Sequence, residues 1–301
     1  MTSRPVLLQW FAIACVTVIA LSGCHSMDRA EAVSEMNKGL EALEGGRTLD
    51  AVRHLKEAST IDPEFAEPPY YLGQIYHRKL SEPDSAEQNY REAMSRDETN
   101  PQFAYQLGTI LQEQNKHSDA IAYLKKATEA KPDFAKAWFR LGLSFDFEKD
   151  YSSAIDAYSK SIHANARMRM DKEDKGGAAY HALGDLYNRF GFYDHALKVY
   201  SNALENNPDV PRLLSGEGVA QLKLKRFPEA EASFTKALEI DPSQTTAIFN
   251  RGVAYMAEGA TDKAVQGFEE FVSRADSERD EARIVAAQGF IQQIREKAKE
   301  N

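Results

Sequence analysis

Catalytic and metal-binding chemistry finds few candidates in this chain of 301 residues. Its seven histidines show no His-Glu-x-x-His pattern, in which two imidazoles one helical turn apart hold a metal ion. They stand at positions 25, 54, 77, 117, 163, 181 and 195. A Gly-x-Ser-x-Gly nucleophile motif is absent, and so is a glycine-rich loop that would bind phosphates. The sequence therefore predicts a protein that is not an enzyme and that holds no cofactor or metal.

Both cysteines lie near the N-terminus, and Cys24 directly follows Leu21-Ser22-Gly23. An uncharged apolar stretch over residues 6–20, which contains Cys15, comes after the basic Arg4. It is short for a membrane-spanning helix, which needs about 20 residues, and it favours an export signal. The Leu-Ser-Gly-Cys sequence resembles the bacterial lipobox. This resemblance implies that residues 1–23 are removed as a signal peptide and that Cys24 carries a lipid.

A lipid on Cys24 has two consequences for the mature chain. No free thiol remains to form a disulfide, to bind zinc or to act as a nucleophile. Residues 24–31 become a short tether, because the seven residues after the cysteine reach at most about 25 Å, and less if they are the frayed start of the first helix. The next residue is His25 rather than aspartate, which the resemblance associates with the outer membrane. We therefore expect a protein anchored to the bacterial cell envelope and facing the periplasm.

A period of 34 residues organises the rest of the chain, and residues 101–134 show it most clearly. Small and apolar side chains there recur three, four and seven places apart in two blocks, which is helical spacing. Asn115 lies between the blocks and tolerates the left-handed turn that ends a helix. One such helix pair buries too little apolar surface to fold alone. It must therefore stack on neighbours.

The same offsets recur in seven segments, which are 32–65, 66–100, 101–134, 135–168, 177–210, 211–244 and 245–278. Their Trp-Leu-Gly-Tyr…Ala…Phe…Ala…Pro pattern resembles the tetratricopeptide repeat. The resemblance implies an all-α fold, an α-α superhelical solenoid of helical hairpins. Residues 279–301 carry an apolar stripe and are expected to form a C-terminal capping helix. The stripe consists of Ile284, Ala287, Ile291 and Ile294.

Several places depart from the period. Residues 169–176 are an insertion, which we interpret as a solvated loop after a lengthened helix, or as a lip or hinge. Repeat two carries an extra residue near Leu80, so its turn is expected to differ. In repeat six Glu217 replaces a buried leucine, which predicts a weak junction. Glycine or asparagine ends the first helix at positions 46, 115, 191 and 259, but repeats two, four and six lack such a residue.

Composition excludes some classes of partner. Charged residues make up 28% and apolar residues 43%, as is ordinary for a soluble helical protein. The net charge is −9, and no basic stripe is visible. Because binding to nucleic acid requires cations that neutralise phosphates, we expect no nucleic-acid partner. The acidic balance also argues against a face that rests on anionic lipid.

The resemblance places the second, fifth, ninth and twelfth residues of each first helix on a concave groove that takes peptides or partner helices. Repeats two to four carry rings at the fifth place, Tyr70, Tyr105 and Phe139, with Gln74, His77 and Thr109 at groove places beside them. Rings supply contact area at low entropic cost, and amides pair with a peptide backbone. We predict a peptide-binding ladder here; the alternative is that these rings are packing residues common in the family. The fifth repeat carries His181, Asp185 and Asn188 at the same places, and the sixth carries Ser215, Val219 and Leu222.

Two basic groove residues suggest a carboxylate site. Lys136 and Arg140 lie one helical turn apart, and together they would receive one carboxylate of a peptide. Chaperone-binding relatives grip a C-terminal carboxylate with five lysine, asparagine and arginine residues from three consecutive repeats. In this chain only Lys136 and Arg140 match that pattern, so a full clamp is not predicted.

Both ends of the groove are apolar. Phe249 stands with Val219, Leu222, Val253 and Met256 at one end, and Val33, Met36, Leu40 and Leu43 stand at the other. An exposed apolar groove indicates a partner site, and a helix would fit it. The C-terminal helix or a second copy of the chain would fill it equally well, so a homo-oligomer remains open.

Taken as a whole, the resemblance implies a non-catalytic scaffold or adaptor that binds partner polypeptides in the groove. Two narrower roles follow from similar envelope lipoproteins. One is a pilotin-like factor for assembly of a secretin or type IV pilus, and the other is a regulatory adaptor of a cell-wall enzyme. The opposing class is an enzyme, or a regulatory subunit of one, with its active site in the groove.

Overall fold

The computed structural model describes residues 27–168 and 177–300. Within these ranges all regular secondary structure is helical, and no strand occurs. The all-α fold class predicted from the sequence is confirmed. The chain divides into two compact units, unit 1 at Met1–Glu148 and unit 2 at Lys149–Asn301. The predicted signal peptide, Cys24 and the predicted insertion 169–176 lie outside the described residues.

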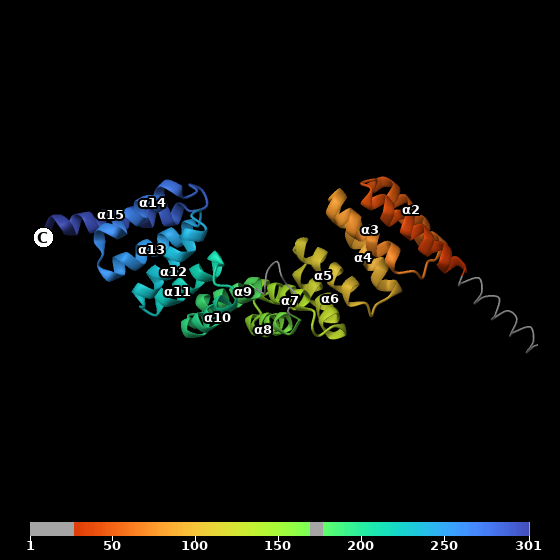
Figure 1. Cartoon of the computed structure of the whole chain (residues 1–301), viewed down its shortest axis with the longest axis horizontal. Coiled ribbons are helices and arrows are strands. Elements are labelled where there is room, and N and C mark those ends of the chain that lie inside the picture. Colours follow the sequence, from red (N-terminus) through yellow and green to blue (C-terminus); the bar gives the residue numbers. More distant parts are fainter. Residues whose placement is uncertain (1–26, 169–176, 301) are drawn as a thin grey trace, which may run out of the picture. The chain divides into compact units, whose positions relative to one another are not determined.

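Unit 1 consists of helices that contact one another in chain order (Figure 1). Residues 27–44 form a helix that leads into α2. The elements after it are α2 (Thr48–Ile61), α3 (Glu67–Ile75), the π-helical turn η1 (Tyr76–Leu80), α4 (Pro83–Arg96), α5 (Pro101–Glu113), α6 (His117–Ala130) and α7 (Ala135–Phe147). The first helices of successive hairpins also touch, since α5 contacts α7 as well as α6.

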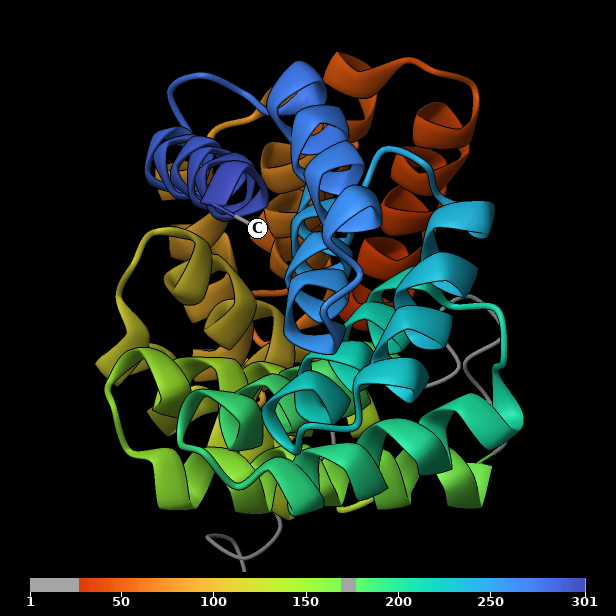
Figure 2. The ribbon, with the colours of Figure 1, turned by 90° about the vertical axis from the view of Figure 1, so that its left-hand side faces the viewer.

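Unit 2 repeats this arrangement and closes with a longer helix (Figure 2). Its elements are α8 (Tyr151–Met168), α9 (Gly177–Arg189), α10 (Tyr193–Asn206), α11 (Pro211–Lys223), α12 (Phe227–Ile240), α13 (Thr245–Glu258), α14 (Thr261–Arg274) and α15 (Glu281–Glu300). First helix α11 contacts both α9 and α13, so these three lie side by side. Helix α15 packs on α14 and buries Ala287. No helix of the described ranges is both long and apolar enough to cross a bilayer.

Glycine in the first helix lets the two helices of a hairpin approach closely. A Cβ atom at Gly184 would lie 2.5 Å from Cζ of the Tyr200 ring, and one at Gly73 would lie 2.6 Å from the Tyr90 ring. Real Cβ atoms essentially never come so near. Both tyrosine rings are almost fully buried, so the glycines are required by packing rather than by backbone conformation.

Left-handed residues end the first helices of all seven hairpins. Gly46, Asn115, Gly191 and Gly259 have φ of 74°, 60°, 80° and 79°, which confirms the prediction for those turns. In repeats two, four and six the equivalent residues are Ser81, Lys149 and Lys225, with φ of 56°, 63° and 60°. The turn geometry is therefore imposed by the hairpin even where the residue type does not favour it. Each such side chain costs about 1–2 kcal/mol against glycine in that conformation.

The extra residue of repeat two is accommodated by η1. Its five residues form a π-helical turn at the end of α3, and the backbone N–H of Glu82 then donates to the carbonyl of Tyr76 at 2.9 Å. A π turn holds one residue more than an α turn. The expected difference in this turn is confirmed, and α4 keeps its place against α3.

Glu217 is half-buried, and hydroxyl groups from both flanking second helices hold its carboxylate. Ser201 of α10 donates to Oε1 at 2.8 Å, and Ser233 of α12 lies 3.3 Å from Oε2. Ser233 also donates to Gln221 at 2.8 Å. A polar cluster thus replaces the apolar contact that a leucine would make at this junction.

Candidate peptide-binding surfaces

The candidate residues lie on the first helices of the hairpins. We call the first helices of each unit its inner layer. In unit 1 this layer consists of α3, η1, α5 and α7, and in unit 2 it consists of α9, α11 and α13. The predicted site residues from Tyr70 to Arg140 belong to unit 1, and Phe249 belongs to unit 2.

Tyr70 lies among packing residues rather than on an open ladder. Only 9% of its surface is exposed, because the ring of Phe103 covers it at a centroid distance of 4.8 Å and that of Tyr90 lies 6.2 Å away. Tyr105 is half-buried and packs on Phe134, again at 4.8 Å. The rings of Tyr70 and Tyr105, which were predicted to contact a ligand, therefore pack against Phe103 and Phe134 instead.

The remaining ladder residues differ in exposure. Gln74 and Phe139 are half-buried, which leaves part of each side chain open to solvent. Thr109 is 4% exposed, and its hydroxyl has no hydrogen-bond partner in the part of the chain that the structure describes. A ligand would reach Gln74 and Phe139 with little rearrangement, whereas Thr109 lies too deep.

A polar network joins three first helices of unit 1. His77 Nε2 and Glu113 Oε2 lie 2.7 Å apart, and Arg140 Nη2 lies 3.6 Å from Glu113 Oε1. Arg140 also donates from Nη1 to Gln112 Oε1 at 2.9 Å. The Gln112 amide in turn donates to the Arg140 carbonyl at 3.0 Å and to Ser144 Oγ at 2.9 Å. The charged groups of this inner layer thus satisfy one another.

This network bears on the predicted carboxylate site. The guanidinium of Arg140 is already held by Gln112 and lies near the Glu113 carboxylate, so an incoming carboxylate would have to compete with Glu113. Lys136 is exposed and stands one turn earlier on α7. Sequence spacing located both cations on one helix face but gave no sign of Glu113, which comes from α5.

Unit 2 contains a hollow of about 390 Å³ on its inner layer. The hollow is lined by side chains that recur at the repeat period, such as His181 with Ser215 and Asp185 with Val219. The full lining is His181, Asp185, Asn188, Tyr200, Arg212, Ser215, Gly216, Val219, Ser243, Gln244, Thr245 and Thr246. These residues belong to α9, α10, α11, the loop before α13 and the start of α13.

Hydrogen bonds organise the polar lining of this hollow. The Asn188 amide nitrogen donates to the Gly216 carbonyl at 3.2 Å, which ties α9 to α11. The Asn188 carbonyl oxygen has no hydrogen-bond partner in the described chain. Ser215 Oγ donates to Gln244 Oε1 at 2.6 Å and thereby leaves the Gln244 amide nitrogen as a donor. The hollow thus offers the Gln244 amide as a donor, whereas the buried Asn188 oxygen lies too deep for a ligand.

Two titratable side chains in the hollow are held in their neutral forms. Burial lowers the pKa of His181; the charge of Asp185 opposes this shift and that of Arg212 adds to it. Burial raises the pKa of Tyr200, and the Asp185 charge raises it further, while a hydrogen bond from Asn188 opposes the shift. A neutral imidazole and a neutral phenol therefore lie beside Asp185 and Arg212 in the lining.

Phe249 packs against its own hairpin. Its ring lies 5.7 Å from Phe268 and 5.1 Å from Phe271, both of α14. Phe290 of α15 contacts the same cluster, at 5.3 Å from Phe268. The C-terminal helix thus packs on the cluster that contains Phe249, and the partly buried groove residues at this end belong to the same cluster.

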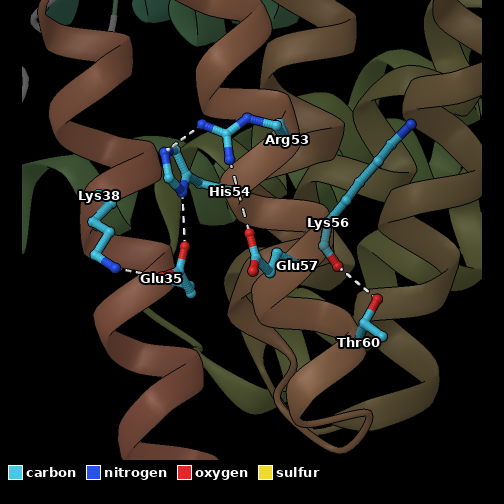
Figure 3. A network of polar contacts seen from close by, with 7 residues as sticks. All are labelled: Glu35, Lys38, Arg53, His54, Lys56, Glu57 and Thr60. Atoms are coloured by element: carbon cyan, nitrogen blue, oxygen red, sulfur yellow. Dashed lines mark hydrogen bonds and ion pairs between the residues drawn. The ribbon is translucent and has the colours of Figure 1, made fainter.

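A second cluster of ligand-type atoms, Glu35, His54 and Glu57, joins the helix at residues 27–44 to α2 (Figure 3). Lys38 pairs with Glu35, and the Arg53 guanidinium lies 2.9 Å from His54 Nε2. Because arginine can only donate, Nε2 accepts and His54 Nδ1 carries the proton that it donates to Glu35 at 2.7 Å. The atom that would face a metal is thus protonated, and two cations occupy the cluster. This arrangement ties two helices together and does not fit a metal site.

Three further hollows lie between second helices. The hollow at Ser201, Leu204, Glu205 and Pro208 has its counterpart at Thr235, Leu238, Glu239 and Pro242, each 34 residues later. Another lies between α2 and α4 in unit 1. Their recurrence at the repeat period marks them as a geometric result of stacking rather than as built sites.

Sequence reasoning missed the hollow of unit 2 as a site. The repeat register places four residues of the hollow on the groove, His181, Asp185, Asn188 and Ser215, but nothing in the sequence distinguishes them from the other groove residues. The spacing of His181, Asp185 and Asn188, at one helical turn and then another, was the available signal. Gln244 lies in a loop and gave no signal.

Family models described as tetratricopeptide repeat match residues 105–168, 181–245 and 246–277. Among curated proteins, the chain is similar to Protein bimA of Emericella nidulans, with 29% identity over 117 residues, or 39% of this chain and 14% of the relative. The chain spans only 10–14% of the length of the first curated relatives that it matches.

Solved structures share the fold. YrrB, described as a TPR protein with an unusual peptide-binding site, matches with a TM-score of 0.54 and 20% identity over 66% of this chain and 97% of its own. PilF of Pseudomonas aeruginosa matches with a TM-score of 0.50 and 17% identity over 87% and 98%. Repeats of this type form protein-interaction scaffolds. By its matched residues and its helical hairpins, the chain belongs to the tetratricopeptide repeat family.

Proposed function

We propose that this protein is a non-catalytic adaptor that binds a segment of a partner polypeptide on the inner layer of its first helices, while a lipid on Cys24 holds it at the bacterial cell envelope. Two parts of this proposal rest on different evidence. Binding is supported by the inner layers, and anchoring is supported by the Leu-Ser-Gly-Cys sequence alone.

The observation that carries the binding proposal is the hollow of unit 2. It is lined from three successive first helices by polar side chains, among them the exposed side chain of Asp185. YrrB, which shares the fold, has a peptide-binding site.

An extended polypeptide fits the dimensions of this surface. Neighbouring helices pack about 8–10 Å apart, so three first helices span about 20 Å. An extended chain covers this distance with about six residues, at about 3.3 Å per residue. Polar side chains of the lining, such as Asp185 and Ser215, suit the N–H and C=O groups of such a chain.

A peptide array tests the binding proposal. The full chain carrying Cys24→Ser, which removes the lipid, is labelled and applied to an array of decapeptides of varied sequence. We expect a subset of peptides to bind, and the double change Asn188→Ala and Ser215→Ala to weaken their binding at least tenfold. Glu239→Gln, on the outer side of α12, is the matched control. Equal binding by both variants would contradict a site on the inner layer.

Mass spectrometry of the chain produced in a bacterial host tests the anchoring proposal. We expect an N-terminal Cys24 that carries acyl chains, and membrane release of the Cys24→Ser variant. A mature chain that begins elsewhere, or that lacks the acyl chains, would contradict the lipid anchor but would leave the binding proposal standing.

The narrower roles are separated by the partner. If the protein acts as a pilotin-like factor, a secretin subunit should bind the purified chain directly, and its assembly should fail without the chain. A cell-wall hydrolase that binds instead, with altered activity, would support the regulatory role. Turnover of a small molecule by the purified chain would contradict both.

A further inference from the structure

We propose that the hollow of unit 2 selects a basic side chain of the bound polypeptide, lysine or arginine, and that the carboxylate of Asp185 receives its charge. This inference rests on the proposed function, because it names the chemistry of the partner segment at the same site. It makes unit 2, rather than the aromatic rings of unit 1, the part that determines sequence preference.

One face of α9 presents acceptors to the hollow. His181, Asp185 and Asn188 are spaced four and three residues apart, so they lie on the same side of the helix, and all three line the hollow. The Asn188 amide nitrogen donates to the Gly216 carbonyl and its carbonyl oxygen is buried, so this side chain holds α9 against α11. The Asp185 side chain is exposed and supplies two acceptor oxygens to the hollow.

Asp185 has no counter-ion within the described ranges, where no hydrogen bond or ion pair reaches its carboxylate. The carboxylate of Glu113, on the inner layer of unit 1, is by contrast engaged by His77 at 2.7 Å and lies 3.6 Å from Arg140. Because the Asp185 side chain is exposed and unpaired in the described chain, a cation in the hollow reaches it without displacing another charged group, although water screens the pair.

Arg212 also lines the hollow, so the balance of the two charges matters. Asp185 acts on the pKa of His181 more strongly than Arg212 does, and it is the one charged group that shifts the pKa of Tyr200. At His181 and Tyr200 the carboxylate therefore acts more strongly than the guanidinium, and it opposes an anionic ligand there.

The rest of the lining suits the stem of a long basic side chain. Val219 and the ring of Tyr200 offer apolar surface beside the acceptors. Lysine and arginine carry an apolar stem behind a charged tip, so the stem contacts such surface while the tip reaches a carboxylate. A neutral His181 adds a further ring without adding a competing positive charge.

The test uses matched synthetic decapeptides. Peptides that bind the Cys24→Ser chain on the array are remade with each lysine or arginine replaced by glutamine, and affinities are measured by fluorescence anisotropy. We expect basic peptides to bind about threefold more tightly than their glutamine forms, as for an exposed ion pair. Asp185→Asn, which keeps the shape and removes the charge, should abolish this difference by weakening the basic peptides more than the glutamine forms.

Two further variants complete the experiment. Arg212→Gln should strengthen the binding of basic peptides, and Glu239→Gln, which removes the same charge from the outer side of α12, should leave it unchanged. Circular dichroism confirms that each variant is folded. If peptides bind without a basic preference, or if Asp185→Asn weakens both forms equally, this inference is overturned while the proposed function stands. If no decapeptide binds the chain, the proposed function itself is overturned.

Discussion

The inner layers of the two units use the same repeat to opposite effect. In unit 1 the polar side chains of α5 and α7 pair with one another, and the ring of Tyr70 is covered by Phe103. In unit 2 the equivalent places surround a hollow in which Asp185 and the Asn188 oxygen lack partners in the described chain. Identical helical spacing therefore does not decide whether an inner layer is closed or open. The residues that reach in from the neighbouring helix decide it.

The largest expected effect tests whether both units depend on the same close packing. Gly73→Ala in unit 1 and Gly184→Ala in unit 2 each place a methyl group within 2.6 Å of a buried tyrosine ring. Because the ring must move, we expect each change to lower the free energy of unfolding by about 2 kcal/mol. Urea denaturation followed by circular dichroism measures this. A loss in one unit alone would show that the hairpins are not packed alike.

The next prediction separates polar groups that stabilise from those that bind. Gln112→Ala removes three hydrogen bonds of unit 1 and leaves Ser144 buried without its partner, so we expect a loss of about 1.5 kcal/mol of stability. Ser215→Ala in the hollow of unit 2 should cost less than about 0.5 kcal/mol because Ser215 is half-buried and has one bond. Equal losses in urea denaturation would remove the distinction between the two layers.

Glu217→Leu should stabilise unit 2 by about 1 kcal/mol. Repeats two to five carry leucine at this place, so a leucine restores their apolar contact, and it removes the desolvation of a half-buried carboxylate. The midpoint of thermal unfolding measures the gain. Glu217→Ala is the control, since it removes the charge without filling the space. If the leucine variant unfolds earlier than the wild type, the hydroxyl cluster is worth more than the packing.

Lys225→Gly should add about 0.5 kcal/mol, because glycine adopts the left-handed conformation without strain but loses more freedom on folding. Residue 225 has a φ of 60°. The opposite change, Gly191→Ala, should cost a similar amount at the equivalent turn. Both are measured by the urea midpoint. A destabilised glycine variant would mean that the Lys225 side chain contributes more than its backbone costs.

The smallest effect is the pH dependence of unit 2. Burial lowers the pKa of His181, so the unfolded chain binds a proton more readily than the folded one. Stability is therefore full above pH 6.5 and falls as the pH drops through the folded-state pKa. Hydrogen exchange of α9 between pH 7.5 and 5.5 measures it. His181→Gln should reduce this dependence, whereas His163→Gln, at an exposed site of α8, should not.

The sequence was sufficient for the hairpins because their determinants are local. Gly46 and Asn115 favour the left-handed conformation of their turns, and Pro132 ends the preceding helix. The sequence was not sufficient for the turn at Lys225, where stacking imposes a conformation that the residue disfavours. The sequence also placed both Tyr70 and Asp185 at groove positions of their repeats without distinguishing them. Tyr70 is covered because Phe103 reaches it from α5. The spacing of residues within one helix does not predict which side chain a neighbouring helix brings against them.

The π-helical turn at Tyr76–Leu80 shows how a repeat can accept an inserted residue. An added residue inside a helix would rotate everything after it by about 100°, since an α-helix has 3.6 residues per turn. Here the surplus residue bulges at the helix end, and α4 still packs against α3 and α5. An added residue is thus tolerated at the turn between two helices, where it changes the turn without disturbing the helix faces that would meet a ligand.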